Sequence, residues 1–382
     1  MKKIYLDYNS TTPMAPSVVD AMIPFLREHH GNPSSAHSFG RAAAEAIEDG
    51  RGKLAGVFGC QNDEIVFTSG GTESNNLAVK GVMFQSAPSA GGHLVISSLE
   101  HAAVFEPARF LERLGYDVTV VGCDQYGVVK LDELESALRE DTKLVSVMHA
   151  NNEVGTIQPI RSIAKLCHDR GILCHTDAAQ TFGKIPVSID ELGVDLLTIA
   201  GHKFYGPKGI GALYVKKGLT LEPFMHGANH ERGMRAGTEN TASIVGLCAA
   251  AKMAHQCLDD TGEQLTKRRD NLAKMLREAI PDLVIHGEAA KRLPNTLSVA
   301  FPRVRGQEIL QRAPEVCAST GAACHSTGEV SSETLNAMGV APELMAGTVR
   351  LSLGWYSNEE VIQQAANLLI DAWENLTVSS SA

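Results

Sequence analysis

The chain has 382 residues, of which 44% are hydrophobic and 20% are charged, and its formal net charge is −10. This length predicts two domains, and the interspersed acidic and basic residues argue against nucleic acid or an anionic membrane as the main partner. No run of about 18 apolar residues occurs, so the sequence predicts no membrane span.

The N-terminal sequence and the cysteines bear on where the protein works. MKKIYLDYNSTTP has two lysines but lacks the apolar stretch of a secretion signal. The eight cysteines form no CxxC pair and show no dense spacing, which fits a reducing compartment better than a disulfide framework. We therefore expect a cytoplasmic protein. Histidines and cysteines also lack zinc-ligand spacing, so we predict no metal site.

Short apolar runs alternate with helical stretches through the first part of the chain. The runs cover residues 64–68, 93–98, 117–121, 144–149, 172–176, 195–200 and 210–215. This alternation is typical of the α/β class and predicts a mainly parallel sheet with helices on both faces. Ligands bind where the strands of such sheets end, so the polar residues just after each run are candidates for a site.

The rest of the chain indicates a second, smaller domain. Residues 240–279 are helix-like and lead into apolar runs at 295–301 and 349–354, followed by an amphipathic helix over 358–373. We assign residues 16–255 to a large domain, and residues 1–15 together with 256–382 to a small one.

Lys203 lies in TIAGHKFYGPKG, directly after an apolar run and inside a glycine-rich loop. Lysine is usually a solvated surface residue, which is the ordinary interpretation of this position. The alternative is a buried amine with a lowered pKa, which is what a Schiff base with a carbonyl cofactor needs.

Asp177 and Gln180 follow the run at 172–176. Asp177 could simply cap the next helix. Alternatively, its carboxylate could face the ring nitrogen of a pyridine cofactor and keep that nitrogen protonated, while Gln180 bonds the phenolic oxygen of the ring.

Two further polar segments follow strands. In FTSGGTESNN, Gly71 and Thr72 come between a strand and a helix, where backbone N–H groups and the helix dipole can bind an anion. A tight turn that needs glycine is the alternative. His101 follows the run at 93–98 and is either a cap or surface histidine, or a ring that stacks on a cofactor and moves protons.

Two residues of the predicted small domain complete the candidates. Cys324 lies among small residues in STGAACHSTGE, where a structural cysteine has little to pack against and a nucleophile could reach a substrate. Arg350, in TVRLSLG, could bind a substrate carboxylate or form an ordinary ion pair at a strand end.

Together these segments resemble the cysteine desulfurase and selenocysteine lyase family, class V of the fold-type I enzymes that depend on pyridoxal 5'-phosphate (PLP). The match runs nearly end to end. It includes YLDYNSTTP, GNPSSAHSFG, FTSGGTESNN, HANNEVGTIQP, HTDAAQ, GHKFYGPKG, HERGMRAGTEN, GAACHS and VRLSLG. The resemblance implies a large PLP-binding domain with a mainly parallel mixed sheet and a smaller α+β domain.

The resemblance also implies roles for single residues. Lys203 is similar to the lysine that carries the cofactor, Asp177 to the partner of the ring nitrogen, and His101 to the stacking acid/base. The remaining implied contacts are Gln180 and Asn152 with the ring oxygen and the substrate, and Gly71, Thr72 and His202 with the phosphate. Thr238 resembles the residue that reaches the phosphate of a neighbouring subunit, which implies a homodimer.

The implied reaction converts L-cysteine to L-alanine. Lys203 removes the Cα proton, and Cys324 takes the sulfur as a persulfide and passes it to an acceptor such as an iron–sulfur scaffold. L-selenocysteine is the alternative substrate, because GAACHS looks more like the lyases, whereas the long segment from Cys324 to Gly339 resembles the desulfurases. A non-catalytic scaffold, and a PLP enzyme in which Cys324 is incidental, are further alternatives. Ala200 stands where many desulfurases have a serine that binds the phosphate.

Overall fold

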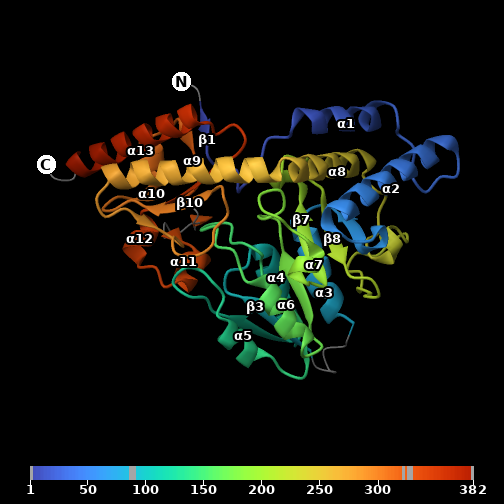
Figure 1. The fold of residues 1–382 in the computed structure, drawn as a ribbon. Helices are drawn as coiled ribbons and strands as arrows, with labels where there is room; N and C mark the ends of the chain where they lie inside the picture. Colours follow the sequence, from blue (N-terminus) through green and yellow to red (C-terminus); the bar gives the residue numbers. More distant parts are fainter. Residues whose placement is uncertain (1–2, 86–91, 321–322, 325–329, 380–382) are drawn as a thin grey trace.

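The computed structural model describes residues 3–85, 92–320, 323–324 and 330–379. Its centre is a seven-stranded sheet with the order β2-β8-β7-β6-β5-β3-β4 (Figure 1). The strands are β2 (Ile65–Thr68), β3 (His93–Ser97), β4 (Asp117–Val121), β5 (Thr142–Ser146), β6 (Leu173–Asp177), β7 (Leu196–Ala200) and β8 (Gly211–Val215). Only β8 runs antiparallel to its neighbours β2 and β7. The predicted mainly parallel mixed sheet is confirmed.

Helices cover both faces of this sheet because alternate residues of its buried strands point to opposite faces. Leu94 and Ile96 of β3 pack with α3 (Gly71–Met83) and α4 (Ala102–Arg113), whereas Val95 belongs to the core on the other face. That second core also takes in residues of α2 (Ser38–Phe58), α6 (Ile160–His168) and α8 (Thr241–Gln256).

A smaller antiparallel sheet of order β14-β10-β9 has its own core. Its strands are β9 (Val284–Ile285), β10 (Thr296–Ala300) and β14 (Thr348–Ser352), and its helices are α9 (Leu258–Ala279), α10 (Gly306–Arg312) and α13 (Glu359–Ser379). Ile4 and Leu6 from the start of the chain pack in this same core. Figure 1 shows α13 and α9 side by side over it.

The remaining elements are short or peripheral. In the described ranges they are the helices α1 (Pro16–Arg27), α5 (Leu131–Ala137), α7 (Ile189–Leu192), α11 (Glu333–Ala337) and α12 (Pro342–Ala346), and 3₁₀ helices at Asn62–Glu64, Gly201–Lys203 and Glu231–Gly233. Two short strand pairs complete the set: β1 (Ile4–Tyr5) with β11 (Val316–Cys317), and β12 (Ala323–Cys324) with β13 (Val330–Ser331).

The predicted helical stretch at 240–279 is two helices, because the chain leaves helical geometry at Cys257 between α8 and α9. The division into domains at residues 255 and 256 therefore falls beside a junction between helices, and it stays a proposal. The last helix extends beyond the predicted residue 373 to Ser379.

The segment after β1 joins the two sheets at the place where the site forms. The backbone N–H of Asn9 donates to Ser352 Oγ at 2.9 Å, and that of Thr12 donates to the carbonyl of His202 at 2.9 Å. Asn9 thereby lies between β14 and the loop after β7.

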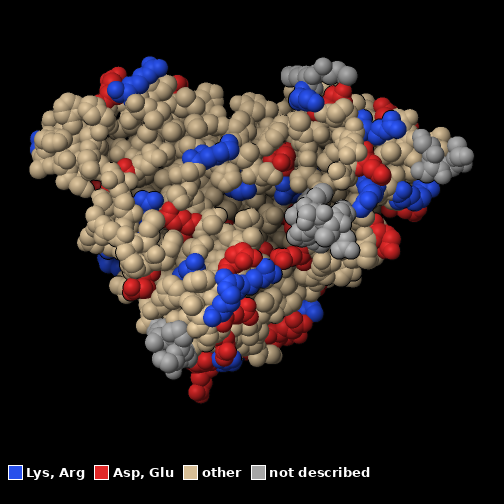
Figure 2. Space-filling model, turned by 180° about the vertical axis from the view of Figure 1, so that it is seen from behind, with Lys and Arg blue, Asp and Glu red and all other residues tan. Residues whose placement is uncertain are grey.

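The charges on the surface and the polarity of the helices agree with what the composition predicts. On the face shown in Figure 2, basic and acidic side chains are interspersed. Within the described part of the chain, every helix is too short or too polar to cross a membrane.

Candidate active site

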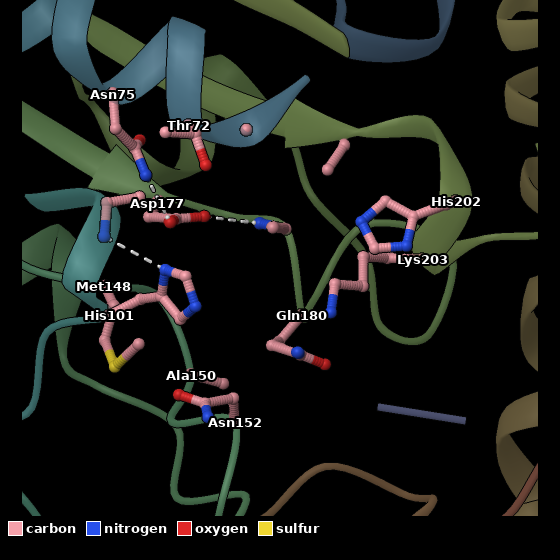
Figure 3. A pocket seen from close by; sticks show the side chains of 14 residues that line it. Thr72, Asn75, His101, Met148, Ala150, Asn152, Asp177, Gln180, His202 and Lys203 are labelled. Atoms are coloured by element: carbon pink, nitrogen blue, oxygen red, sulfur yellow. Dashed lines mark hydrogen bonds between the residues drawn. The ribbon is translucent and has the colours of Figure 1, made fainter. Parts of the chain in front are cut away.

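A cavity of about 200 Å³ lies at the carboxyl ends of the parallel strands. Figure 3 shows side chains from α3, from the start of α4 and from the loops after β6 and β7 converging on it. Most of the residues predicted from the sequence line this one cavity, namely Gly71, Thr72, His101, Asn152, Asp177, Gln180, His202 and Lys203.

Asp177 is the last residue of β6 and supplies a buried carboxylate at one end of the cavity. The residue is 7% exposed, with Oδ2 accepting from Asn75 Nδ2 at 2.7 Å and Oδ1 from the backbone N–H of Ala179 at 2.9 Å. These two donors fix the plane of the carboxylate. Asp177 therefore accepts a capping bond from Ala179 and also faces the cavity, so both interpretations of this residue apply.

Lys203 ends the short 3₁₀ helix that follows β7, and its amine lies opposite Asp177 (Figure 3). Nζ donates to the backbone carbonyls of Asn9 at 2.6 Å and Ser10 at 2.9 Å. Burial, together with the nearby charge of Arg350, lowers the pKa of Lys203 from 10.5 to about 8. The amine is thus partly neutral near physiological pH, as a nucleophile or a base must be.

The opposite end of the cavity suits an anion. Helix α3 begins at Gly71, so its free N–H groups and dipole point towards this end. A Cβ atom on Gly71 would lie in ordinary van der Waals contact with Ala200 Cβ, at 3.4 Å, so the start of α3 packs beside the end of β7. His202 lies beside it with Nδ1 3.2 Å from Thr11 Oγ1, and burial with the charges of Lys203 and Lys208 lowers its pKa to about 4. His202 is therefore a neutral hydrogen-bonding group.

His101 is the N-cap of α4, and its Nδ1 accepts the backbone N–H of Ala103 at 3.1 Å. A nitrogen that accepts this bond carries no hydrogen, so the neutral ring has its hydrogen on Nε2. His101 consequently combines the capping role with a ring that lines the cavity.

Three predicted residues are not among those lining the cavity in the described structure. Arg350 forms an ion pair with Asp7 at 2.7 Å, and it donates to Ser10 Oγ at 2.7 Å and to the carbonyl of Asn152 at 3.1 Å. Thr238 is exposed on the loop before α8. The backbone of Cys324 lies in β12, but its side chain is outside the described part of the chain, as is His325.

Sequence analysis missed three buried polar residues of the site: Asn9, Asn75 and Lys184. Asn75 lines the cavity one turn into α3 and donates a hydrogen bond to Asp177. Lys184 donates to both Asn9 and Gln180, and Gln180 donates to the carbonyl of Asn9. The spacing of four residues between Gln180 and Lys184 was the one available signal. The contact with Asn9 depends on the tertiary fold.

The hydrogen-bonding groups that line the cavity fit a molecule with an anionic group at one end and a protonated ring nitrogen at the other. The start of α3 with His202 serves the anion, Asp177 serves the nitrogen, and the Lys203 amine faces the same cavity. Asn75 Oδ1 in this site is buried and has no hydrogen-bond partner among the residues that the structure describes. An unpaired buried acceptor fits a site that completes its bonding when a ligand or water binds.

Comparison with known proteins agrees with this geometry. A family model described as aminotransferase class-V matches residues 4–365. The chain belongs to this family. Among its class-V relatives, a cysteine desulfurase IscS from Dictyoglomus turgidum is 46% identical, over 99% of this chain and 96% of that protein. The predicted family is therefore confirmed.

Solved structures of class-V relatives share the fold. A NifS-like protein superposes with a TM-score of 0.90 at 38% identity, covering 98% of this chain and all of that one. A structure described as SspA in complex with cysteine has a TM-score of 0.83 at 36% identity, covering 92% of this chain and 99% of that one. The fold-type I architecture is thus confirmed.

Proposed function

We propose that this protein is a PLP-dependent cysteine desulfurase, which converts L-cysteine to L-alanine and takes up the sulfur on Cys324 as a persulfide. The observation that carries the proposal is the cavity in which the Asp177 carboxylate, the Lys203 amine and the anion-binding start of α3 converge. The names of the class-V relatives, cysteine desulfurases at up to 46% identity in the comparison, support the choice of reaction.

The residues of the cavity divide the binding of the cofactor between them. Bound PLP supplies an electron sink that stabilises negative charge at the substrate Cα. Lys203 would hold it covalently, and Asp177 would keep its ring nitrogen protonated. Gly71, Thr72 and His202 would bind its phosphate, with Ala200 adding no hydroxyl, and Gln180 its ring oxygen. His101 would stack on the ring and donate from Nε2.

Substrate binding falls to Asn152 and Arg350. Asn152 lines the cavity, and its carbonyl accepts from Arg350 Nη1 at 3.1 Å, so the two residues are linked. Arg350 Nε is buried and lacks a partner among the described residues, which leaves a donor for the substrate carboxylate. Once Lys203 is free, its neutral amine removes the Cα proton.

Sulfur transfer requires a thiolate at Cys324. The thiolate attacks the substrate sulfur and a sulfur–sulfur bond forms, while the carbon–sulfur bond breaks and leaves its electron pair on the substrate carbon. Protonation of that carbon gives the methyl group of alanine. The persulfide then passes to an acceptor protein such as an iron–sulfur scaffold. We also propose a cytoplasmic homodimer, in which the exposed Thr238 reaches the phosphate bound by the neighbouring subunit.

The test is turnover of L-cysteine and L-selenocysteine, measured side by side with PLP-loaded protein. We expect alanine and persulfide sulfur from L-cysteine in equal amounts. Turnover of L-selenocysteine alone would instead support a selenocysteine lyase, to which GAACHS around Cys324 points. Absence of turnover on both substrates would support a non-catalytic scaffold.

The lowered pKa of Lys203 predicts how cofactor capture depends on pH. A protonated amine cannot attack the PLP aldehyde, so the capture rate should rise as Lys203 loses its proton, with a midpoint near pH 8. An exposed lysine would give a midpoint above 10. The measurement is stopped-flow absorbance after PLP is mixed with cofactor-free protein over a range of pH. A midpoint above 10 would contradict the burial argument.

A further inference from the structure

Lys184 is a buried lysine beside the cavity. It lies in the loop between β6 and α7, and its residue is 8% exposed. Its Nζ donates to Gln180 Oε1 at 2.9 Å and to Asn9 Oδ1 at 3.1 Å. The preceding Gly183 has φ +75° and packs against Phe204, where a Cβ would lie 2.9 Å from Phe204 Cβ, so the turn that buries Lys184 requires glycine.

The partners of Lys184 are unusual for a buried lysine. Both are amide oxygens, and among the described residues no carboxylate lies within ion-pair distance of Nζ. Buried lysines are generally paired with a carboxylate, because an uncompensated charge is costly to bury. Burial and the charges of Lys203 and Arg350 hold the pKa of Lys184 well below its usual range. A neutral amine with two N–H donors matches these two acceptors.

Asn9 completes the arrangement around Gln180. Its carbonyl accepts from Gln180 Nε2 at 3.0 Å and from Lys203 Nζ at 2.6 Å, and its Oδ1 accepts from Lys184. Asn9 is 1% exposed, and its own Nδ2 donates to Thr296 Oγ1 at 2.8 Å, so its amide cannot turn freely. The Gln180 amide is therefore held at both ends, with its oxygen on Lys184 and its nitrogen on Asn9.

We propose that Lys184 is a positioning residue that fixes the Gln180 amide so that its second N–H faces the ring oxygen of the cofactor. This inference rests on the proposed function, because it assigns a means of orientation to the cofactor contact of Gln180. An amide that turned over would place Oε1 against the carbonyl of Asn9 and present an acceptor to the cavity. Lys184 opposes that rotation by supplying a donor on the oxygen side.

The experiment is a double-mutant cycle on PLP affinity, with Lys184→Met and Gln180→Ala as the single variants. Methionine keeps the length of the side chain and removes both donors. We expect Lys184→Met to weaken PLP binding about tenfold, the effect of losing one well-made hydrogen bond. In the Gln180→Ala background the same substitution should change PLP affinity by less than about twofold, because its target is gone.

Two controls separate positioning from general stability. Lys165→Met removes an exposed lysine of α6 that pairs with Asp169 and should leave PLP affinity unchanged. The absorbance maximum of bound cofactor, which reports the hydrogen bond to its ring oxygen, should shift in Lys184→Met but not in Lys165→Met. Lys184→Gln keeps a neutral donor and should bind PLP within about threefold of the original protein, which also provides a second variant if Lys184→Met does not fold.

Each outcome of these measurements supports or overturns the proposed role of Lys184. An unchanged affinity and spectrum in Lys184→Met would overturn the proposal, as would an equal loss with and without Gln180. A loss in Lys184→Gln as large as in Lys184→Met would show that the donor is not what matters, and would overturn it too. If the unsubstituted protein binds no PLP, the proposed function fails instead, so the two failures are distinguishable.

Discussion

Alanine at position 203 should reduce the turnover of L-cysteine by at least about ten-thousand-fold, because one residue both holds the cofactor and moves the Cα proton. PLP added to Lys203→Ala should bind only reversibly and be lost on dialysis. Alanine formation and cofactor absorbance after dialysis are the two measurements.

Arginine at the same position provides the matched control for Lys203. A guanidinium keeps a positive charge near the carbonyls of Asn9 and Ser10 but stays protonated, so it can neither attack an aldehyde nor act as a base. Lys203→Arg should therefore be as inactive as Lys203→Ala. Activity in the arginine variant would mean that position 203 contributes charge alone and would contradict the assigned chemistry.

Alanine at position 324 should bring sulfur transfer from L-cysteine to the background rate while leaving PLP binding intact. The carbon–sulfur bond of cysteine needs a thiolate acceptor, and Cys324→Ala removes it. Addition of L-cysteine should still change the cofactor absorbance, because binding and removal of the Cα proton depend on Lys203. Alanine and sulfide release over time give the comparison.

Cys257→Ala is the control for that substitution, because Cys257 is an exposed thiol at the junction of α8 and α9, remote in the sequence from the GAACHS segment. It should retain full activity. Persistent turnover of L-cysteine in Cys324→Ala would show that Cys324 is incidental and that the protein is another kind of PLP enzyme. If only L-selenocysteine turnover survived, a lyase without a persulfide step would be indicated.

The strands of the large sheet could be predicted from the sequence because they are short apolar runs bounded by polar or glycine-rich turns. Residues 117–121 and 196–200 appear as strands almost as expected. The predicted run at 144–149 is displaced from β5, which covers Thr142–Ser146, although the backbone N–H groups of Val147 and His149 still donate to the carbonyls of β6. The two-residue pairing of β1 with β11 carries no periodic pattern and could not be found this way.

The residues of the candidate site also divide into those that the sequence predicts and those that depend on the tertiary fold. Asp177, His101 and Gly71 were predictable because each follows a strand in the chain, and parallel strands bring their ends to one edge. The bond between Asn9 and Lys184 was not, because it joins residues 175 positions apart and depends on how the two sheets pack. The ion pair of Arg350 with Asp7 is likewise a tertiary contact.

The position of Asn9 has a practical consequence for handling the protein. Residues 9–12 belong to the site and not only to the surface, since they contact Lys203, Gln180, Arg350 and His202. Proteolytic trimming past Ser10 would remove part of the catalytic centre while leaving the seven-stranded sheet intact. Purification tags are therefore better placed after the last helix, and a preparation that is folded but inactive should first be checked for an intact N-terminus by mass spectrometry.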